Sequence, residues 1–303
     1  MSVDLRVNLG SLSLKNPVMP ASGCFGFGRE YSEYYSLSAL GAVVVKATTL
    51  HPRLGNPTPR VSEVTSGMLN AIGLANPGLE NVLSEELPWL ARQDVPIIVN
   101  VAGDTMDDYC EVVDRICQSG LAHAIELNVS CPNVQLGGLA FGVEAAVLRN
   151  LVEAVRTVCT LPLFVKLSPN VTRIQDLAIA AASGGADGLS LINTLIGMKI
   201  DLNTRRPVLA NRTGGLSGRA IKPVAVRMVH DVAKEVRLPI IGMGGIYTGH
   251  DAAEFVMAGA WAVEVGTANF TDPYACPRII EELRSFMEAE GIKNIEEIRG
   301  CAL

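Results

Sequence analysis

Short apolar, β-branched runs recur eight times along the chain, and most of them are followed by a stretch with helical spacing. A strand buried on both faces reads as such a run, and a helix after each strand makes neighbouring strands parallel. The alternation predicts a (β/α)8 TIM barrel, in which reactive groups lie just beyond the carboxyl ends of the strands. The predicted strands are 16–22, 42–48, 96–102, 124–129, 162–168, 188–193, 239–243 and 262–266.

The segments around these runs predict helices, one hairpin and three insertions in a single domain over residues 1–303. Residues 5–14 alternate apolar and polar side chains around Gly10 and Ser11, so we expect an N-terminal β-hairpin at the barrel bottom. Long connections follow the second strand (50–74) and the sixth (194–222), and a glycine-rich insertion follows the fourth. Long ordered loops on one barrel face are commonly functional. The predicted helices are 107–119, 144–158, 173–183, 223–236 and 250–258.

Charge and composition exclude several classes of protein. The net charge of −6 comes from interspersed acids and bases, which provide no basic stripe for nucleic acid, so we expect a small-molecule ligand. No apolar run reaches the roughly 18 residues of a membrane span, and the first residues lack a signal-like pattern, which predicts a cytoplasmic protein. The seven cysteines contain no CxxC pair. We therefore expect mostly free thiols rather than a disulfide framework, a zinc site or an iron–sulfur site.

Cys131 is the candidate catalytic residue, because it follows the fourth predicted strand in a glycine-rich loop. A reachable thiol can take or give a proton at moderate pH. The alternative is a small core residue, the usual fate of a free cysteine, but the neighbouring Pro132, Gly137 and Gly138 favour a loop. His123 begins the strand and is expected at the opposite barrel end, so no Cys–His nucleophile pair is indicated.

Glycine motifs at the ends of the last two strands predict a phosphate site. Gly244 and Gly245 end the seventh strand, and Gly266 and Thr267 end the eighth. Barrels often bind phosphate with backbone N–H groups of these two loops, where glycine allows close approach. The alternative is that these glycines only permit tight turns. A Rossmann fingerprint is not met, because Tyr247 stands where its third glycine would be.

Two lysines and four asparagines are candidate ligand-binding residues. Lys46 and Lys166 lie within apolar strands, where an inward-facing lysine needs a ligand charge or a carboxylate unless it snorkels to water. Amide groups at the strand ends can bind the polar rim of a flat heterocycle, although singly each asparagine is more often a turn former or cap. The asparagines are Asn100, Asn128 and Asn193 at strand ends and Asn70 in the long loop after the second strand.

Together these residues resemble the active site of class 1B dihydroorotate dehydrogenases. The most similar segment is Asn128-Val129-Ser130-Cys131-Pro132-Asn133, with Gly137-Gly138 and Ala140-Phe141-Gly142 behind it. The resemblance continues through 16–17, 46–49, 70–74, 165–170, 214–218 and the two C-terminal glycine motifs.

The resemblance implies oxidation of (S)-dihydroorotate to orotate in de novo pyrimidine (UMP) biosynthesis. Cys131 would take the C5 proton while C6 delivers hydride to N5 of FMN. The implied substrate contacts are Lys46, Asn70, Ala71, Ile72, Gly73, Leu74, Asn128, Asn193 and Thr194. The implied FMN contacts are Ser22, Lys46, Ala47, Asn100, Asn128, Lys166, Ile192, Gly218, Gly244, Gly245, Gly266 and Thr267, of which the last four would hold the phosphate.

The resemblance also implies the NAD-linked type. The membrane-bound class uses serine as base, whereas this chain has Cys131. The Gly-Gly-x-Ala-Phe-Gly continuation resembles chains that work with a second subunit carrying FAD and a [2Fe–2S] cluster, in a heterotetramer built on a homodimer of the catalytic chain. This sequence has no cysteine cluster or dinucleotide fingerprint of its own. The alternatives are a fumarate-linked class 1A enzyme, a Schiff-base aldolase-type lyase using Lys166, and a non-catalytic subunit.

Overall fold

Eight parallel strands form the centre of the computed structural model, which describes residues 3–129, 135–136, 139–140 and 142–303. Each of the eight predicted strands is confirmed, with ends that differ by at most two residues from the prediction. The strands are β3 (Val18–Pro20), β4 (Val43–Thr48), β7 (Ile97–Val101), β8 (Ala124–Asn128), β11 (Leu163–Lys166), β12 (Gly188–Leu191), β17 (Ile240–Met243) and β18 (Ala262–Val265).

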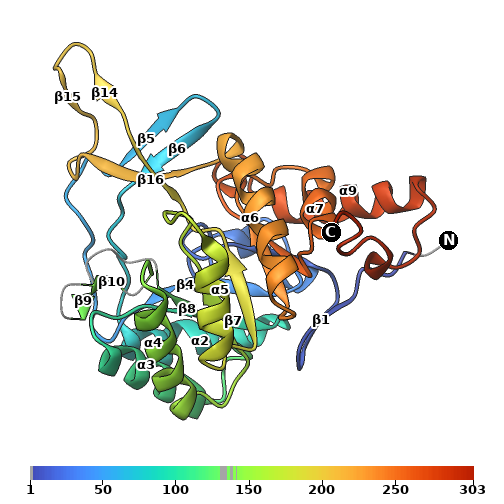
Figure 1. The fold of residues 1–303 in the computed structure, drawn as a ribbon, viewed down its shortest axis with the longest axis horizontal. Coiled ribbons are helices and arrows are strands. Elements are labelled where there is room, and N and C mark those ends of the chain that lie inside the picture. The colour runs from blue at the N-terminus through green and yellow to red at the C-terminus, as the bar shows by residue number, and fades with distance from the viewer. Residues whose placement is uncertain (1–2, 130–134, 137–138, 141) are drawn as a thin grey trace.

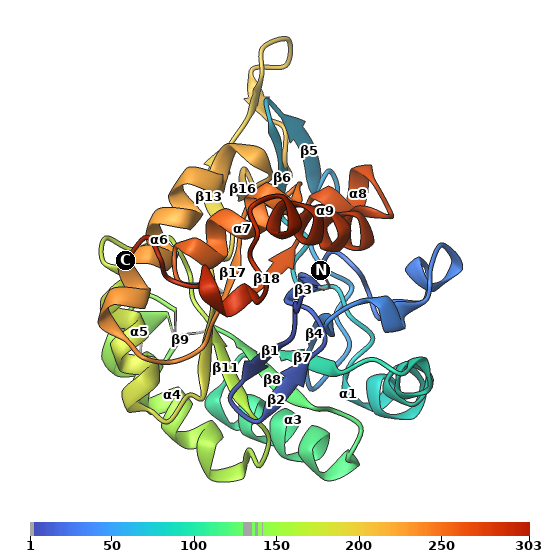
Figure 2. The same ribbon diagram turned by 90° about the vertical axis from the view of Figure 1, so that its right-hand side faces the viewer.

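The sheet is nearly closed into the predicted barrel. Its strand order is β3-β18-β17-β12-β11-β8-β7-β4, and every neighbouring pair is parallel. At the seam between the two end strands, the N–H of Gly41 donates to the carbonyl of Val18 at 3.0 Å. The strand residues are buried on both faces of the sheet. Helices cover its outside (Figures 1 and 2). This burial explains why the strands read as continuous apolar runs.

The outer layer confirms the five predicted helices to within one residue at each end. Both α3 and α7 begin with a capping box, Thr105 with Asp108 and Thr248 with Asp251, which fixes their first turns. Only short 3-10 turns, Tyr31–Glu33 and Leu37–Ala39, lie between β3 and β4. The helices are α1 (Leu79–Asn81), a π-helical stretch (Val82–Glu86), α2 (Leu87–Leu90), α3 (Met106–Ser119), α4 (Ala145–Val158), α5 (Ile174–Ser183), α6 (Lys222–Glu235), α7 (Gly249–Met257), α8 (Ala268–Thr271) and α9 (Ala275–Ala289), with further 3-10 turns Ala91–Gln93, Arg219–Ile221 and Ile295–Glu297.

The predicted N-terminal hairpin is present as β1 (Val7–Leu9) and β2 (Leu12–Leu14), which pair in antiparallel register. In each strand the two outer residues are buried and the middle one is exposed. The hairpin lies at the end of the barrel opposite the insertions (Figures 1 and 2). Within the described part of the chain, no helix combines the length and apolar character that a membrane crossing requires.

The insertions after the second and sixth barrel strands pair with each other. The first contributes β5 (Val61–Val64) and β6 (Gly67–Asn70), and the second contributes β13 (Leu195–Met198) and β16 (Thr213–Ser217). They form one antiparallel sheet in the order β13-β16-β6-β5, which we call the insertion sheet. A smaller hairpin projects beyond it (Figure 1). The remaining short strands are β14 (Ile200–Asp201), β15 (Arg206–Pro207), β9 (Gln135–Leu136) and β10 (Leu139–Ala140), the last two being the insertion after the fourth strand.

Candidate active site

The candidate polar residues of the central strands meet at the carboxyl end of the barrel. Asn128 and Lys166 are the last residues of β8 and β11 and lie opposite each other in the register, as Asn100 and Glu126 do in β7 and β8. The Asn128 side chain donates to Oδ1 of Asn100 at 3.4 Å, and the Asn100 amide donates to Oε1 of Glu126 at 2.5 Å. Asn128, Asn100 and Glu126 therefore form a chain of hydrogen bonds, and the sequence analysis missed the glutamate.

Lys166 lies at the centre of this end of the barrel and is buried together with two carboxylates. Its Nζ donates to Oε1 of Glu126 at 3.2 Å, to Oε2 of Glu264 at 3.3 Å and to Oγ of Ser22 at 3.3 Å. Both glutamate side chains are at most 1% exposed. The expectation that Lys166 needs a negative partner is confirmed. The same signal, a charge inside an apolar strand, was present at both glutamates.

The two carboxyl groups of this cluster, Glu126 and Glu264, hold one proton between them. Burial raises the pKa of Glu264 well above its usual range, and the neighbouring Glu126 raises it further. Burial opposes ionisation of Glu126 as well, but Lys166 and the hydrogen bonds from Ser190 and Asn100 hold its pKa below the usual value. Oε1 of Glu264 accepts no hydrogen bond from any described residue, which favours the neutral carboxyl. The cluster is then Lys166 ammonium, Glu126 carboxylate and neutral Glu264.

This assignment predicts how Glu264→Gln alters stability with pH. Because the folded-state pKa of Glu264 is raised, its contribution to stability is complete below pH 4.5 and is lost as pH rises toward the raised pKa. Glutamine is neutral and lacks this dependence. We expect the free energy of unfolding of the variant to rise relative to that of wild type, by at most about 1.4 kcal/mol per pH unit above 4.5. Denaturant unfolding at pH 5 and pH 8 measures the difference, and a constant difference would contradict a neutral Glu264.

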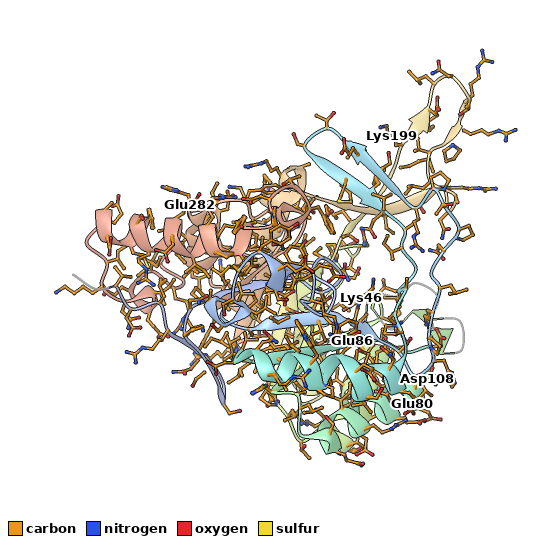
Figure 3. The ribbon with its side chains drawn as sticks, turned by 180° about the vertical axis from the view of Figure 1, so that it is seen from behind. Lys46, Glu80, Glu86, Asp108, Lys199 and Glu282 are labelled. Carbon is orange, nitrogen blue, oxygen red and sulfur yellow. The ribbon has the colours of Figure 1, made fainter. Side chains whose placement is uncertain are left out.

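Lys46 lies in β4 on the side of the barrel that faces the insertions (Figure 3). Its side chain is half-buried, and burial, reinforced by the positive charge of Arg60, lowers its pKa. Its backbone N–H donates to the carbonyl of Gly26 at 3.0 Å, which ties β4 to the loop after β3. The adjacent Ala47 is buried. A lysine partly withheld from water is well suited to pair with an anionic ligand.

The predicted phosphate residues converge at the ends of β16, β17 and β18. Gly244 and Gly245 have φ values of +124° and +84°, which other residues adopt only with strain. A Cβ on Gly245 would lie 2.9 Å from the carbonyl of Gly218, so these two glycines are in close contact. Oγ1 of Thr267 donates to Oγ of Ser217 at 2.8 Å, which joins the β18 loop to the insertion sheet. The turns that follow β16, β17 and β18 are therefore in contact with one another.

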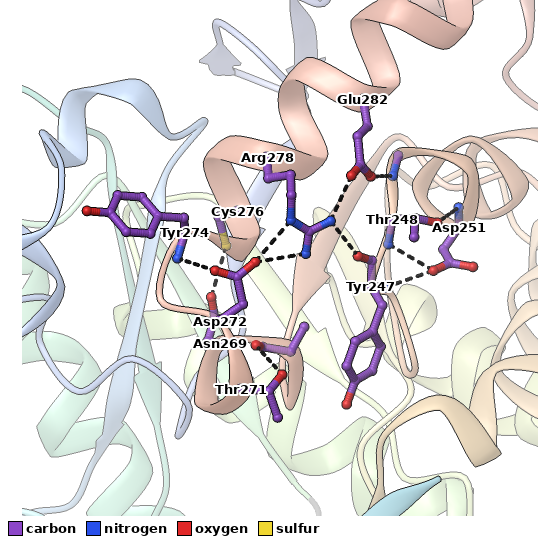
Figure 4. A network of polar contacts seen from close by, with 12 residues as sticks. Tyr247, Thr248, Asp251, Asn269, Thr271, Asp272, Tyr274, Cys276, Arg278 and Glu282 are labelled. Atoms are coloured by element: carbon purple, nitrogen blue, oxygen red, sulfur yellow. Dashed lines mark hydrogen bonds and ion pairs between the residues drawn. The ribbon is translucent and has the colours of Figure 1, made fainter.

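A polar network that the sequence analysis did not identify holds Tyr247, two residues after Gly245 (Figure 4). The Arg278 guanidinium, from α9, donates to the Tyr247 carbonyl at 3.2 Å and pairs with Asp272 and Glu282. Asp251 accepts from the N–H groups of Tyr247 and Thr248, each at 2.9 Å. The capping-box pattern Thr248-x-x-Asp251 was the available sequence signal. This network fixes the loop that carries Gly244 and Gly245.

The predicted substrate residues lie where the insertion sheet meets the barrel. Asn70, at the end of β6, donates from Nδ2 to the carbonyl of Gly215 at 3.4 Å. Oγ1 of Thr194 lies against Gly215, where an added Cβ would come within 2.1 Å of it. Oδ1 of Asn193 accepts from the N–H of Thr194 at 2.8 Å. Asn70, Asn193 and Thr194 therefore lie close together, although Asn70 is distant from the other two in the sequence.

The segment 71–74 continues from Asn70 in an irregular conformation. Gly73 and Leu74 have positive φ values of 75° and 55°, and the Asn56 side chain donates to the Ala71 carbonyl at 3.0 Å. Ile192 is buried directly after β12, and its N–H donates to the Met243 carbonyl at 3.0 Å. Cys131, with Gly137 and Gly138, lies outside the described residues.

Cys24 is the other thiol near this end of the barrel. Its Sγ would lie 3.6 Å from a Cβ placed on Gly266. Burial raises the pKa of the Cys24 thiol to about 11, so the group stays protonated near neutral pH. It is therefore poorly suited to accept a proton. Among the residues that the structure describes, no cluster of histidine, cysteine and acidic side chains could hold a metal ion.

Comparison with known proteins identifies the family. A family model described as dihydroorotate dehydrogenase matches residues 4–287. The chain belongs to the dihydroorotate dehydrogenase family. It is thus an oxidoreductase, as the resemblance implied. A protein of Bacillus pumilus named dihydroorotate dehydrogenase B (NAD(+)), catalytic subunit, is 60% identical over 296 residues, which are 98% of this chain and 96% of that protein.

Further relatives agree with this assignment. Proteins of the same name from a Geobacillus species and from Bacillus thuringiensis are 60% and 59% identical, each over 98% of this chain and at least 95% of theirs. A crystal structure of DHODH in complex with ferulenol from Eimeria tenella has a TM-score of 0.82 and 28% identity, and covers 98% of this chain and 88% of that one. The sequence relatives and the similar crystal structure therefore both support assignment to the dihydroorotate dehydrogenase family.

Proposed function

We propose that this chain is the catalytic FMN subunit of an NAD-linked dihydroorotate dehydrogenase and oxidises (S)-dihydroorotate to orotate in pyrimidine synthesis. The observation that carries the proposal is 60% identity over 98% of the chain to relatives named as that catalytic subunit. The site supports it, because charged, amide and glycine-rich elements meet at the carboxyl end of one barrel. The proposal treats residues 1–303 as one FMN-binding domain.

The residues at this site fit a flavin phosphate. Gly244 and Gly245 present backbone that carries no side chain, and Lys46 provides a cationic group partly withheld from water. FMN, when bound, supplies the acceptor for the substrate hydride. The proposed FMN contacts are Ser22, Lys46, Ala47, Asn100, Asn128, Lys166, Ile192, Gly218, Gly244, Gly245, Gly266 and Thr267. Of these, Gly244, Gly245, Gly266 and Thr267 hold the phosphate.

The protein's own residues orient the substrate and remove its proton. Lys46 pairs with the substrate carboxylate, while the amides of Asn70, Asn128 and Asn193 bind its ring polar groups. Thr194 and the segment 71–74 complete the substrate pocket. Cys131 accepts the C5 proton from the face opposite the hydride acceptor, a role that rests on the family resemblance. Removing a proton and a hydride from opposite faces avoids a long-lived carbanion.

We place the electron acceptor on a separate subunit. The relatives' name specifies NAD(+) and a catalytic subunit, and such a chain needs a partner to pass electrons on. The proposed partner carries FAD and a [2Fe–2S] cluster, and the complex is a cytoplasmic heterotetramer built on a homodimer of this chain. Co-purification with tagged chain tests the partner. Rapid reduction of fumarate by the isolated chain, with no iron–sulfur flavoprotein recovered, would favour the class 1A alternative.

The visible spectrum before and after addition of dihydroorotate tests the proposed reaction. We expect a bound flavin whose absorption bleaches anaerobically as orotate forms. The aldolase alternative predicts a colourless protein and trapping of substrate on Lys166 by borohydride. The structure argues against that alternative, because Glu126 and Glu264 raise the pKa of Lys166, and a Schiff base requires the neutral amine.

Gly266→Ala tests the phosphate site without disturbing the fold. The nearest atoms to a new Cβ would be Cys24 Sγ at 3.6 Å and Ala21 Cβ at 3.8 Å, both ordinary contacts. We therefore expect the apo variant to unfold within about 2 °C of the wild-type Tm. A methyl group facing the phosphate should nevertheless weaken FMN binding about tenfold or more, as measured by fluorescence titration. Unchanged FMN affinity would place the phosphate elsewhere.

A further inference from the structure

Cys117 and Cys159 form a close thiol pair on the outer layer, away from the proposed substrate site. Cys117 lies in the last turn of α3, and Cys159 directly follows α4, 42 positions later in the sequence. Their Sγ atoms are 4.0 Å apart. Cys117 is partly exposed, whereas Cys159 is buried. Neither thiol has a role in the proposed dehydrogenase reaction.

The surroundings of Cys117 favour its thiolate. Its Sγ is hydrogen-bonded to Sγ of Cys159, and this contact, with hydrogen bonds to the backbone of Thr160 and Leu161, lowers the pKa of Cys117 to about 6. The same interaction raises the pKa of Cys159, so the pair holds one proton. The guanidinium of Arg156 is fixed beside Cys159, where it donates to the carbonyls of Cys159 and Leu161. An accessible thiolate beside a second thiol has the arrangement of a reactive cysteine and its resolving partner.

We propose that Cys117 and Cys159 form a reversible disulfide when the protein is exposed to a hydroperoxide. The Cys117 thiolate attacks the O–O bond of hydrogen peroxide; an S–O bond forms and the other oxygen leaves as hydroxide, which takes a proton to become water. Cys159 then attacks the Cys117 sulfur, so that the S–S bond forms and the S–O bond breaks, and the leaving hydroxide takes the Cys159 proton as a second water. Two thiols lose two electrons, and one peroxide is reduced to two waters. A dithiol reductant reverses the reaction.

The geometry allows both steps. Conversion of the Cys117 thiolate to the neutral sulfenic acid removes the interaction that raises the pKa of Cys159 most. Burial still raises this pKa and Arg156 lowers it, so Cys159 gives up its proton as it attacks. The two sulfurs need to approach by about 2 Å to reach disulfide length. The resulting loop runs from residue 117 to residue 159 and encloses β8 and the segment that carries Cys131. The disulfide would thus join the two ends of the segment that carries the proposed catalytic base.

The experiment treats the complete holoenzyme with a few equivalents of hydrogen peroxide, blocks remaining thiols and maps peptides without reduction. We expect a linked Cys117–Cys159 peptide and a rise in Tm of about 5 °C, both reversed by dithiothreitol. In Cys159→Ser, oxidation should stop at a Cys117 sulfenic acid that dimedone labels. Cys110→Ser, on the same helix, is the matched control and should behave as wild type.

Two results would overturn the proposal. One is the absence of the linked peptide from peroxide-treated wild type while other thiols oxidise. The other is loss of the linked peptide in Cys110→Ser, or a Cys159→Ser variant in which dimedone labels no sulfenic acid at Cys117. The first result comes from the peptide map of the wild-type protein alone. The test therefore does not depend on any variant folding normally.

Discussion

Replacing Cys131 by alanine is expected to slow reduction of the bound flavin by dihydroorotate by about 10²–10⁴-fold, the usual contribution of a general base. Without the thiol, the proposed acceptor of the C5 proton is missing. FMN content and orotate affinity should change little, because binding rests on the lysine, amide and glycine groups. Anaerobic stopped-flow absorbance measures the reduction rate, and equilibrium titration measures orotate binding.

Cys131→Ser separates the proton transfer from the loss of volume. Serine keeps the shape of the side chain, but its hydroxyl is a far poorer proton acceptor than a thiol at neutral pH. We expect flavin reduction to be slow at pH 7. Cys110→Ser, at a partly buried position of α3, controls for general effects of cysteine replacement. A wild-type rate in Cys131→Ser would exclude the thiol as the base.

Lys166→Met is expected to lower the free energy of unfolding by about 3–5 kcal/mol at neutral pH, the cost of removing one partner from a buried ion pair. Methionine retains much of the side-chain length but leaves Glu126 and Glu264 without their shared cation. Both carboxyl pKa values should then lie above 4.5, so the stability is retained at low pH and is lost as pH rises. Denaturant unfolding at pH 5 and pH 8 measures this loss.

The matched control is the triple variant Lys166→Met, Glu126→Gln, Glu264→Gln, in which none of the three side chains can ionise. Neutral side chains of similar size should recover most of the stability lost in Lys166→Met, since replacing a whole buried ion cluster is often neutral. FMN affinity should remain low in both variants if Lys166 contacts the flavin. A loss of stability from pH 5 to pH 8 in Lys166→Met that is no larger than the loss in wild type would show that the glutamates do not depend on Lys166.

Local patterns were sufficient to predict the barrel. A strand covered on both faces must be apolar throughout, and each helix must be apolar on one side, so strand and helix positions can be read from short windows. The same reasoning located Lys166, because a cation in an apolar run needs a partner. It also placed the glycine turns of β17 and β18, where the carboxyl ends of the strands must meet.

Contacts between distant segments could not be predicted in this way. Nothing within residues 61–70 indicates that Asn70 will pair opposite Gly215, because the pairing depends on how both insertions leave the barrel. The partners of Lys166 were missed for a related reason. Glu126 and Glu264 carry the same local signal as the lysine, but only the closed sheet shows that all three point to one centre.

The shared insertion sheet restricts how the substrate preference of this enzyme can be redesigned. Gly215 pairs with Asn70, and Thr194 packs against Gly215, so a replacement loop grafted at one site would lose its complement at the other. Chimaeras between relatives should therefore exchange residues 50–74 and 194–222 together. Swapping either alone would separate two halves of the proposed substrate-binding surface, even though the barrel beneath would be untouched.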